Sequence, residues 1–257
     1  MAGAEPTRTH GIKHEDAAGP RMPPRRPPHP TPDELLARGA EALGLRLEPS
    51  GLAALRLYCE EIARWSVRLN LTALRTPEEV VREGILDSLA CLPLIPPGPL
   101  QVVDVGSGAG FPALPLKLVR PDLSVTLVEA SRKKATFLEH VARSLGLTGV
   151  RVVRARAEAI VTDPREAGGY DLGLARAVAA PPDAGRLVRP LLRPGGLFLV
   201  QLGAGPLPPG AWDRLLALGF EVVREFPLPP ALGRPGRRVV ALRRVDSGSR
   251  AENLEQR

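Results

Sequence analysis

The sequence predicts an α/β protein: a seven-stranded, mostly parallel, doubly wound sheet preceded by an N-terminal helical segment. Beyond residue 99, short runs rich in Val and Leu alternate with segments of helical periodicity. These runs are almost continuously apolar, as in strands that are buried on both faces. Residues 31–98, by contrast, show only helical periodicity. Alternating strands and helices place the helices on both faces of a parallel sheet.

The N-terminal third divides into a tail and a helical subdomain. Residues 1–30 include the run PRMPPRRPPHP and hold too few apolar side chains for a core, so we expect a disordered tail. Met22 lies in this tail, and the sequence leaves open whether the chain starts at Met1 or Met22. Residues 31–98 are expected to form a helical subdomain, with helices over 31–44, 49–70 and 76–95.

The strands follow in residues 99–245. The apolar runs predict seven of them: Leu100–Val105, Ser124–Glu129, Val150–Arg154, Tyr170–Leu174, 195–202, 219–226 and 236–245. Helices are expected over Pro112–Val119, Arg132–Leu145 and Pro182–Leu192. The loop between the last two strands is too short for a crossover helix, so these strands should pair as an antiparallel end of the sheet. Residues 246–257 are expected to be a flexible tail.

Composition excludes several classes of protein. No apolar run approaches the roughly 18 residues of a membrane span, and the N-terminus lacks the apolar stretch of a secretory signal. Cys59 and Cys91 fit no metal spacing. His140 is the single histidine outside the tail, so a zinc hydrolase or a histidine-dependent triad lacks parts. We therefore expect a cytoplasmic protein without a bound metal or a membrane partner.

The net charge of +7 permits a nucleic-acid partner but does not demonstrate one. Residues 31–231 carry 23 basic and 22 acidic side chains, so the surplus lies at the two ends of the chain. The basic residues Arg237, Arg238, Arg243 and Arg244 of the last predicted strand could contact RNA. The alternative is that they protect an exposed edge strand from aggregation.

The turn after the first strand carries the chemistry. Asp104 closes the strand, and Gly106, Gly108 and Gly110 follow, which allows positive φ and close approach of a ligand. Gly108, Gly110 and Ala113 also satisfy the G-x-G-x-x-A pattern of nicotinamide-binding proteins. That pattern would begin four residues beyond Asp104, however, and a carboxylate there would repel a pyrophosphate. The charge therefore favours the sulfonium and ammonium groups of S-adenosylmethionine.

Further positions agree with a nucleotide-like cofactor. Glu129 ends the second strand, where an acid commonly accepts hydrogen bonds from ribose hydroxyls; the alternative is a solvated acid beside Arg132. Ala157 and Glu158 follow the third strand, where this fold contacts the adenine, although Glu158 could equally cap a helix.

Several segments together resemble the ribosomal RNA small-subunit methyltransferase G family, also called glucose-inhibited division protein B. The similar stretches are RLNLTALRTPEEVVREGILDSL, VVDVGSGAGFPALPLKLVRPDLSVTLVEASRKKATFLEHV, RAEA, ARAVA and GRRVVAL, which span roughly residues 35–243. The resemblance implies a class I, Rossmann-like methyltransferase domain over residues 99–245. It also implies transfer of a methyl group from S-adenosylmethionine to N7 of a guanine in 16S rRNA or a small-subunit precursor.

The resemblance also implies roles for particular residues. Gly106, Phe111, the Ala157–Glu158 pair and Arg176 would contact the cofactor, and Arg176 would orient the guanine or the cofactor. The alternative for Arg176 is an ion pair with an acid such as Asp183. Asn70 and Thr72 would face RNA or cofactor, as would Asp87, and for all three helix capping and packing compete with that role.

This chain departs from the family pattern at three positions. Gly84 stands where a histidine is usual, Leu202 where a lysine is usual, and Ala113 where glycine is common. The loss of two basic side chains could weaken RNA contacts without affecting the cofactor turn. The alternatives therefore stay open: methylation of a small molecule or protein, or a nicotinamide-binding Rossmann protein.

The expected chemistry requires no acid or base. The N7 lone pair of guanine is free at neutral pH, so methyl transfer can depend on alignment of the two reacting atoms. For this reason we leave the catalytic residues unassigned, with Arg176 as a candidate for substrate orientation. We expect the protein to act as a monomer.

Overall fold

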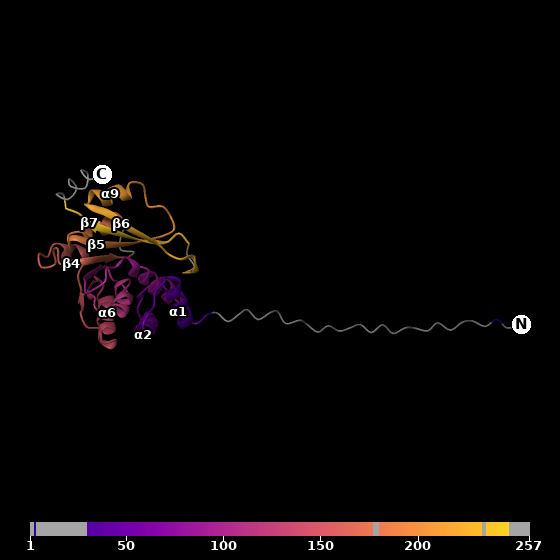
Figure 1. Ribbon diagram of the computed structural model, residues 1–257. Helices are drawn as coiled ribbons and strands as arrows, with labels where there is room; N and C mark the ends of the chain where they lie inside the picture. Colours follow the sequence, from indigo (N-terminus) through magenta and orange to yellow (C-terminus); the bar gives the residue numbers. More distant parts are fainter. Residues whose placement is uncertain (1–2, 4–29, 177–179, 233–234, 247–257) are drawn as a thin grey trace.

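The computed structural model describes Gly3 and residues 30–176, 180–232 and 235–246 (Figure 1). Nearly all of the expected tail over 1–30, Met22 included, lies outside the described residues, as do residues 247–257 and the last three residues of the ARAVA motif. Among the described residues no helix is long and apolar enough to cross a membrane.

The helical segment begins with two amphipathic helices, α1 (Pro32–Ala42) and α2 (Pro49–Ser66). Thr31 caps α1: its hydroxyl accepts the Glu34 N–H, and the Glu34 carboxylate accepts the Thr31 N–H. Four of the residues of α1 are buried, and the face that α2 buries includes Leu55, Tyr58 and Ile62. Both helices were expected from their periodicity.

The helix expected over 76–95 is interrupted. It consists of α3 (Pro77–Glu79), a π-helix η1 (Val80–Leu86), α4 (Asp87–Leu89) and a 3₁₀ turn η2 (Leu92–Leu94). Thr76 caps the start, as predicted. In the π-helical turn, the Ser88 hydroxyl and the Arg176 guanidinium donate to the Gly84 carbonyl. Side-chain donors of this kind help satisfy the carbonyls of a widened turn.

Seven strands form one sheet in the order β3-β2-β1-β4-β5-β7-β6. They are β1 (Gln101–Val105), β2 (Ser124–Val128), β3 (Val150–Val153), β4 (Tyr170–Ala175), β5 (Leu192–Leu202), β6 (Phe220–Pro227) and β7 (Arg238–Arg244). The first five strands are parallel, and β7 is antiparallel to both β5 and β6. The predicted seven-stranded, mostly parallel sheet is confirmed.

The idea that the β7 arginines protect an edge strand is wrong. β7 lies between β5 and β6, so β6 forms the edge of the sheet. The sequence could not show this, because the short loop between the two strands allows either of them to pair with β5. Charge protection of an edge is therefore no explanation for Arg237 or Arg238.

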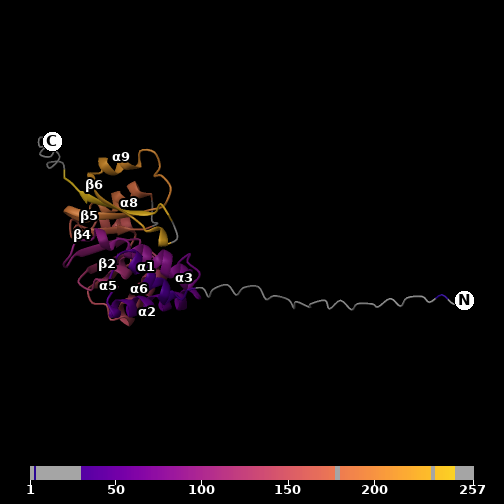
Figure 2. The ribbon, with the colours of Figure 1, turned by 45° about the vertical axis from the view of Figure 1, so that its right-hand side comes forward.

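Helices cover both faces of the sheet (Figures 1 and 2). α5 (Ala113–Val119) and α6 (Arg132–Ser144) lie on one face together with α1 and α2. α8 (Pro181–Val188) and α9 (Ala211–Ala217) pack on the other face, and short α7 (Ala157–Val161) contacts α8. The sequence pattern did not predict α9, a seven-residue helix that follows Gly210.

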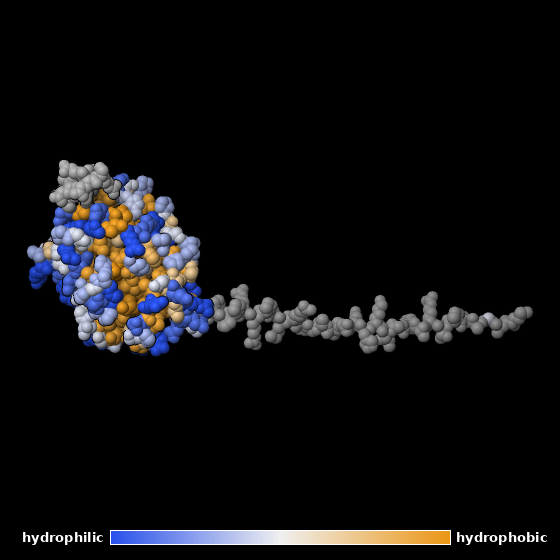
Figure 3. Space-filling view, viewed as in Figure 1, coloured by the Kyte–Doolittle hydropathy of each residue, from blue (hydrophilic) through white to orange (hydrophobic). Residues whose placement is uncertain are grey.

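Each face of the sheet has its own hydrophobic cluster. The larger cluster joins side chains of the N-terminal helices, such as Leu55 and Ile62, to Leu114, Phe137 and Leu199 of the α/β part. The smaller cluster lies beneath α8 and α9. Because the larger cluster contains residues of both, the helical segment and the sheet share one continuous core. On the surface, the space-filling view shows hydrophobic residues between hydrophilic ones on one face (Figure 3).

Candidate functional site

The glycine turn lies at the point where the strand order reverses. β1 pairs with β2 on one side and β4 on the other, and the turn leaves the carboxyl end of β1 between them. The N–H groups of Gly106 and Ser107 donate to the Val128 carbonyl at 2.8 and 3.0 Å, which ties the turn to the end of β2. A crevice at this place is where open α/β sheets bind their ligands.

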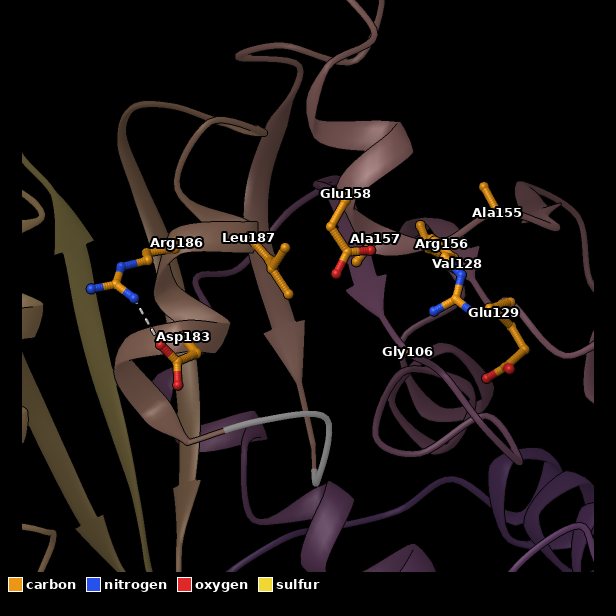
Figure 4. A pocket seen from close by; sticks show the side chains of 11 residues that line it. Gly106, Val128, Glu129, Ala155, Arg156, Ala157, Glu158, Asp183, Arg186 and Leu187 are labelled. Atoms are coloured by element: carbon orange, nitrogen blue, oxygen red, sulfur yellow. Dashed lines mark hydrogen bonds and ion pairs between the residues drawn. The ribbon is translucent and has the colours of Figure 1, made fainter.

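Two cavities meet at this turn, and Gly106 and Glu129 line both of them. The first, of about 430 Å³, lies between the end of β2, the start of α7 and α8 (Figure 4). The second, of about 410 Å³, lies between the turn and the loop after α2 and reaches Arg176. We call them the nucleotide-side cavity and the acceptor-side cavity. Gly106 and Glu129 form the wall that the two cavities share.

Glu129 is buried at this shared wall, and main-chain donors hold its carboxylate. One oxygen accepts the Gly108 N–H at 2.8 Å and the other accepts the Ser131 N–H at 2.7 Å. A carboxylate has about four lone-pair sites, so each oxygen keeps capacity for one more donor. A pair of adjacent hydroxyls, as on a ribose, fits that remaining capacity.

The three glycines of the turn have different surroundings. All have positive φ, at 72° for Gly106, 59° for Gly108 and 98° for Gly110. A Cβ on Gly108 would meet only the Gly106 carbonyl oxygen, at 3.8 Å, so it would extend into the acceptor-side cavity. A Cβ on Gly110 would lie 2.4 Å from a Leu114 methyl carbon instead. Gly110 lines neither cavity, and its cofactor contact stays a prediction.

Asp104 lies beneath the turn and lines neither cavity. Its side chain is fully buried, and neither carboxylate oxygen has a hydrogen-bond partner among the described residues. Burial raises the pKa of Asp104 to about 8. At neutral pH the group is then mostly protonated in the ligand-free protein, whereas the charge argument assumed a carboxylate; a bound cation would favour the ionised form. Direct contact between Asp104 and the cofactor stays a prediction.

Ala157 and Glu158 line the nucleotide-side cavity at the start of α7, as the sequence positions suggested. Leu187 and Arg186 of α8 stand across from them (Figure 4), and sequence reasoning missed both. Arg186 is bound to Asp183 at 2.9 Å on the same helix. A mostly apolar slot with polar groups at its rim suits a flat heterocycle such as adenine.

Phe111 lines the acceptor-side cavity and is packed from three sides. The Tyr58 ring meets it edge-on at 5.7 Å, and the Arg176 guanidinium lies 5.6 Å from its centre. A Cβ on Gly84 would come within 2.4 Å of the Phe111 ring. The departure at Gly84 therefore has a structural consequence: in this chain the ring occupies the space that a side chain at position 84 would need.

Arg176 is held by the helical segment. Its guanidinium lies 3.6 Å from the Asp87 carboxylate and donates to the main-chain carbonyls of Glu83 and Gly84. The alternative of an ion pair with an acid is thus confirmed in kind, but the acid is Asp87 and not Asp183, which pairs with Arg186. Burial lowers the pKa of Arg176, and burial raises that of Asp87 although the neighbouring guanidiniums oppose it.

The residues expected to contact RNA fall in two places. Thr72 lines the acceptor-side cavity, where its hydroxyl accepts the Leu74 N–H at 3.2 Å, and exposed Asn70 lies on the same loop. Arg237 forms an ion pair with Asp87, and Arg238 pairs with Glu225 at 2.6 Å. The structure thus brings Thr72 to the site and gives both arginines internal partners.

Sequence reasoning also missed Tyr58 and Lys134. The Tyr58 hydroxyl donates to the Ala109 carbonyl at 2.5 Å, which fixes the glycine turn against α2. Tyr58 continues the buried face of its helix, so its pattern indicated packing alone. Lys134 lines the acceptor-side cavity, and its signal was the SRKK run that directly follows Glu129 and Ala130.

Comparison with known proteins agrees with this geometry. Residues 51–207 match the family model of the rRNA small subunit methyltransferase G. The chain is 40% identical over 214 residues to the ribosomal RNA small subunit methyltransferase G of Roseiflexus castenholzii, covering 83% of this chain and 85% of that protein. It is 44% identical over 187 residues to the protein of that name from Deinococcus deserti, covering 70% and 73%.

Solved structures agree in fold. The [4+2]-cyclase SpnF matches with a TM-score of 0.52 at 17% identity, over 78% of this chain and 98% of that chain. A ribosomal protein L11 methylase from Lactobacillus delbrueckii matches with a TM-score of 0.50 at 17% identity, over 64% and 79%. The glycine turn, the acid at the end of β2, the strand order and these matches show that the chain belongs to the rRNA small subunit methyltransferase G family of S-adenosylmethionine-dependent methyltransferases.

Proposed function

We propose that the protein transfers the methyl group of S-adenosylmethionine to N7 of a guanine in small-subunit ribosomal RNA. The observation that carries the proposal is the pair of cavities that meet at Gly106 and Glu129, in a chain of this family. One cavity suits the nucleoside of the cofactor. The other is open to an acceptor base and is bordered by Arg176 and Phe111.

The residues present fit the cofactor. Ala157, Glu158 and Leu187 would enclose the adenine, and Glu129 would accept the ribose hydroxyls through its free lone pairs. Gly106 and Gly108 would leave room for the methionine part, because both line the acceptor-side cavity without a side chain. When bound, S-adenosylmethionine supplies a methyl group on a positively charged sulfur.

The remaining task for the protein is alignment. Guanine N7 is a nucleophile without prior deprotonation, so the site needs no general base. Arg176 can donate to O6 or a phosphate of the acceptor nucleotide; a donor on N7 itself would block methylation. The Phe111 ring lies beside the Arg176 guanidinium and lines the same cavity. Holding the acceptor in line with the methyl group supplies most of the rate enhancement.

Lys134, which lines the acceptor-side cavity, and basic residues next to the cavity lining in the sequence support an RNA partner. Arg132, Lys133 and Lys134 are the first three residues of α6, and Arg75 follows the loop that lines the same cavity. None of their charged groups has an ion-pair partner among the described residues. Cations at a helix N-terminus cost about 0.3–1 kcal/mol each, because they oppose the helix dipole. Such a local cost is typical of a functional surface, and RNA phosphates would offset it.

Arg237 and the three arginines of β7 are weaker candidates for RNA contact. Arg243 pairs with Glu221 at 3.2 Å, and Arg244 donates to the carbonyls of Leu192 and Arg189. Together with Arg237 and Arg238, they all have partners within the protein. We therefore propose that RNA docks along the start of α6 and the loop with Asn70 and Thr72, and that the protein acts as a monomer.

Loss of one modified nucleoside tests the function. Small-subunit rRNA from a strain that lacks this gene should contain one 7-methylguanosine fewer by mass spectrometry, and the wild-type gene should restore it. The Gly106→Val variant should not restore it, because the valine side chain fills the shared wall of the cavities. Unchanged rRNA would reject this substrate and leave a small-molecule or protein acceptor.

Charge reversal tests the docking surface. We expect Lys133→Glu to raise the KM for undermethylated small subunits while the Kd for S-adenosylmethionine stays unchanged. Arg143→Glu is the matched control, since Arg143 is an exposed cation in the last turn of the same helix. Equal effects of the two substitutions would contradict docking at the start of α6.

A further inference from the structure

Asp87 is a buried acid at which separate parts of the fold meet. It lies in α4, directly after the π-helix, and its side chain is 3% exposed. Two arginines form ion pairs with its carboxylate. Arg176 lies one residue beyond the end of β4, and Arg237 lies one residue before the start of β7. The main-chain carbonyl of Asp87 accepts the Gln201 amide of β5 at 2.7 Å. Helical segment and sheet are therefore joined here by polar contacts as well as by the core.

An arrangement of this kind is costly, so it calls for an explanation. Desolvation of a buried ion pair offsets much of its attraction, and well-packed apolar residues would often stabilise a fold better. The two arginine side chains are themselves only about one-fifth exposed. Stability alone is thus a weak reason for one carboxylate between two guanidiniums. The position of Arg176 supplies a better one.

The contacts of Arg176 fix both its place and its orientation. Asp87 attracts the guanidinium at 3.6 Å, the carbonyls of Glu83 and Gly84 accept its N–H groups, and its plane lies near the Phe111 ring at 5.6 Å. A guanidinium has five N–H donors in a rigid fork. Two of its nitrogens donate to π-helix carbonyls, and Asp87 attracts the charge from 3.6 Å, which constrains the orientation of the remaining donors at the acceptor-side cavity.

We propose that Asp87 is a positioning residue, which holds the Arg176 guanidinium at the wall of the acceptor-side cavity so that it meets the acceptor nucleotide in one orientation. Arg237, which pairs with the same Asp87 oxygen, keeps that carboxylate in place. The inference rests on the proposed function, since it assumes that Arg176 contacts the methyl acceptor. It predicts that Asp87 affects methylation only through Arg176.

A double-mutant cycle tests this dependence. The variants are Asp87→Asn, Arg176→Ala and the double substitution, assayed for methylation of undermethylated small subunits and for S-adenosylmethionine affinity by calorimetry. We expect each single variant to lower kcat/KM by about tenfold or more, the scale of one charge-assisted hydrogen bond. The Kd for the cofactor should change less than about twofold, and the double variant should be no worse than Arg176→Ala alone.

A matched control separates positioning from stability. Glu166 is 12% exposed and pairs with Arg151 at 2.8 Å, beside β3 and away from the acceptor-side cavity. Glu166→Gln should lower thermal stability without changing kcat/KM. Asp87→Asn alone could prove too unstable, because it leaves two guanidiniums without their acid. In that case the combination Asp87→Asn/Arg237→Gln replaces it in the cycle, since it removes one of these guanidiniums. Its activity is then compared with that of Arg237→Gln.

Two outcomes would overturn the inference. In the first, the losses from Asp87→Asn and Arg176→Ala add up in the double variant, which would show that Asp87 acts independently of Arg176. In the second, Arg176→Ala leaves methylation intact. A further measurement, which does not depend on the substrate, could also overturn it: the Nη–H groups of Arg176, which donate to Glu83 and Gly84, should give NMR signals protected from exchange, and this protection should be lost in Asp87→Asn. Its persistence refutes positioning, whereas absent methylation by the wild-type protein refutes only the proposed function.

Discussion

Asp104 should make the stability of the ligand-free protein fall as the pH rises. The carboxyl group is fully buried without hydrogen-bond partners, and its pKa is raised from the ordinary 3.8 to about 8. Between these two values the folded protein keeps a proton that the unfolded chain releases. Stability is therefore greatest below pH 4 as far as this group is concerned, and it declines as the pH rises towards 8.

The size of the effect follows from the shift. Within the window, each rise of one pH unit lowers the free energy of unfolding of the wild-type protein by about 1.4 kcal/mol. From pH 5 to pH 8 the free energy of unfolding therefore falls by about 4 kcal/mol. Asp104→Asn has nearly the same shape and stays neutral throughout. The difference in unfolding free energy between Asp104→Asn and wild type should then grow by about 4 kcal/mol over this interval, in favour of the variant.

Urea unfolding at pH 5, 6, 7 and 8 measures this difference. Glu166→Gln is the control of opposite sign, because Arg151 lowers the pKa of Glu166 and its contribution to stability is constant above about pH 5. The difference between that variant and wild type should therefore stay level. A level difference for Asp104→Asn as well would refute the reasoning and mean that the Asp104 carboxylate is charged and stabilised in the folded protein.

Three further substitutions test the turn and its surroundings. Gly110→Ala should cost roughly 1–3 kcal/mol in urea unfolding, because the Cβ would lie 2.4 Å from Leu114 at a φ of 98°; an unchanged midpoint argues against this packing. Glu129→Gln should weaken S-adenosylmethionine binding by about tenfold or more in calorimetry, since the amide accepts fewer hydrogen bonds; equal affinity would remove Glu129 as the ribose acceptor. Gly84→His should displace Phe111 and lower kcat/KM for small subunits, with the cofactor Kd little changed; full activity would show that the ring tolerates a side chain there.

The sheet and the cofactor turn could be predicted from the sequence because their signals are local. Continuous apolar runs mark buried parallel strands, and Asp104 with its three glycines marks the turn at the end of β1. Glu129 was expected to accept ribose hydroxyls from its place at the end of the next strand; the structure puts it at the shared wall of the two cavities, and the ribose contact stays a prediction.

What the sequence could not reveal depends on contacts between distant residues. The partner of Arg176 is Asp87, 89 positions earlier in the chain, and no local pattern distinguishes it from nearby Asp183. The place of β7 inside the sheet follows from tertiary pairing. The π-helix depends on donors such as Arg176 and on the close approach of Phe111 to Gly84.

The helical segment and the sheet share one core, and the described part of the site holds no histidine or cysteine for acid–base catalysis. Both features have the same explanation. No histidine or cysteine lines either cavity among the described residues, and N7 methylation requires neither. When a reaction depends on alignment alone, the distance between the two ligand sites must be held firmly. Here the cofactor side rests on β1 and β2, while the acceptor side borrows Thr72 from the helical segment and Arg176 fixed to Asp87. On the proposals made above, the common hydrophobic cluster and the Asp87 ion pairs set the geometry on which the methyl transfer depends.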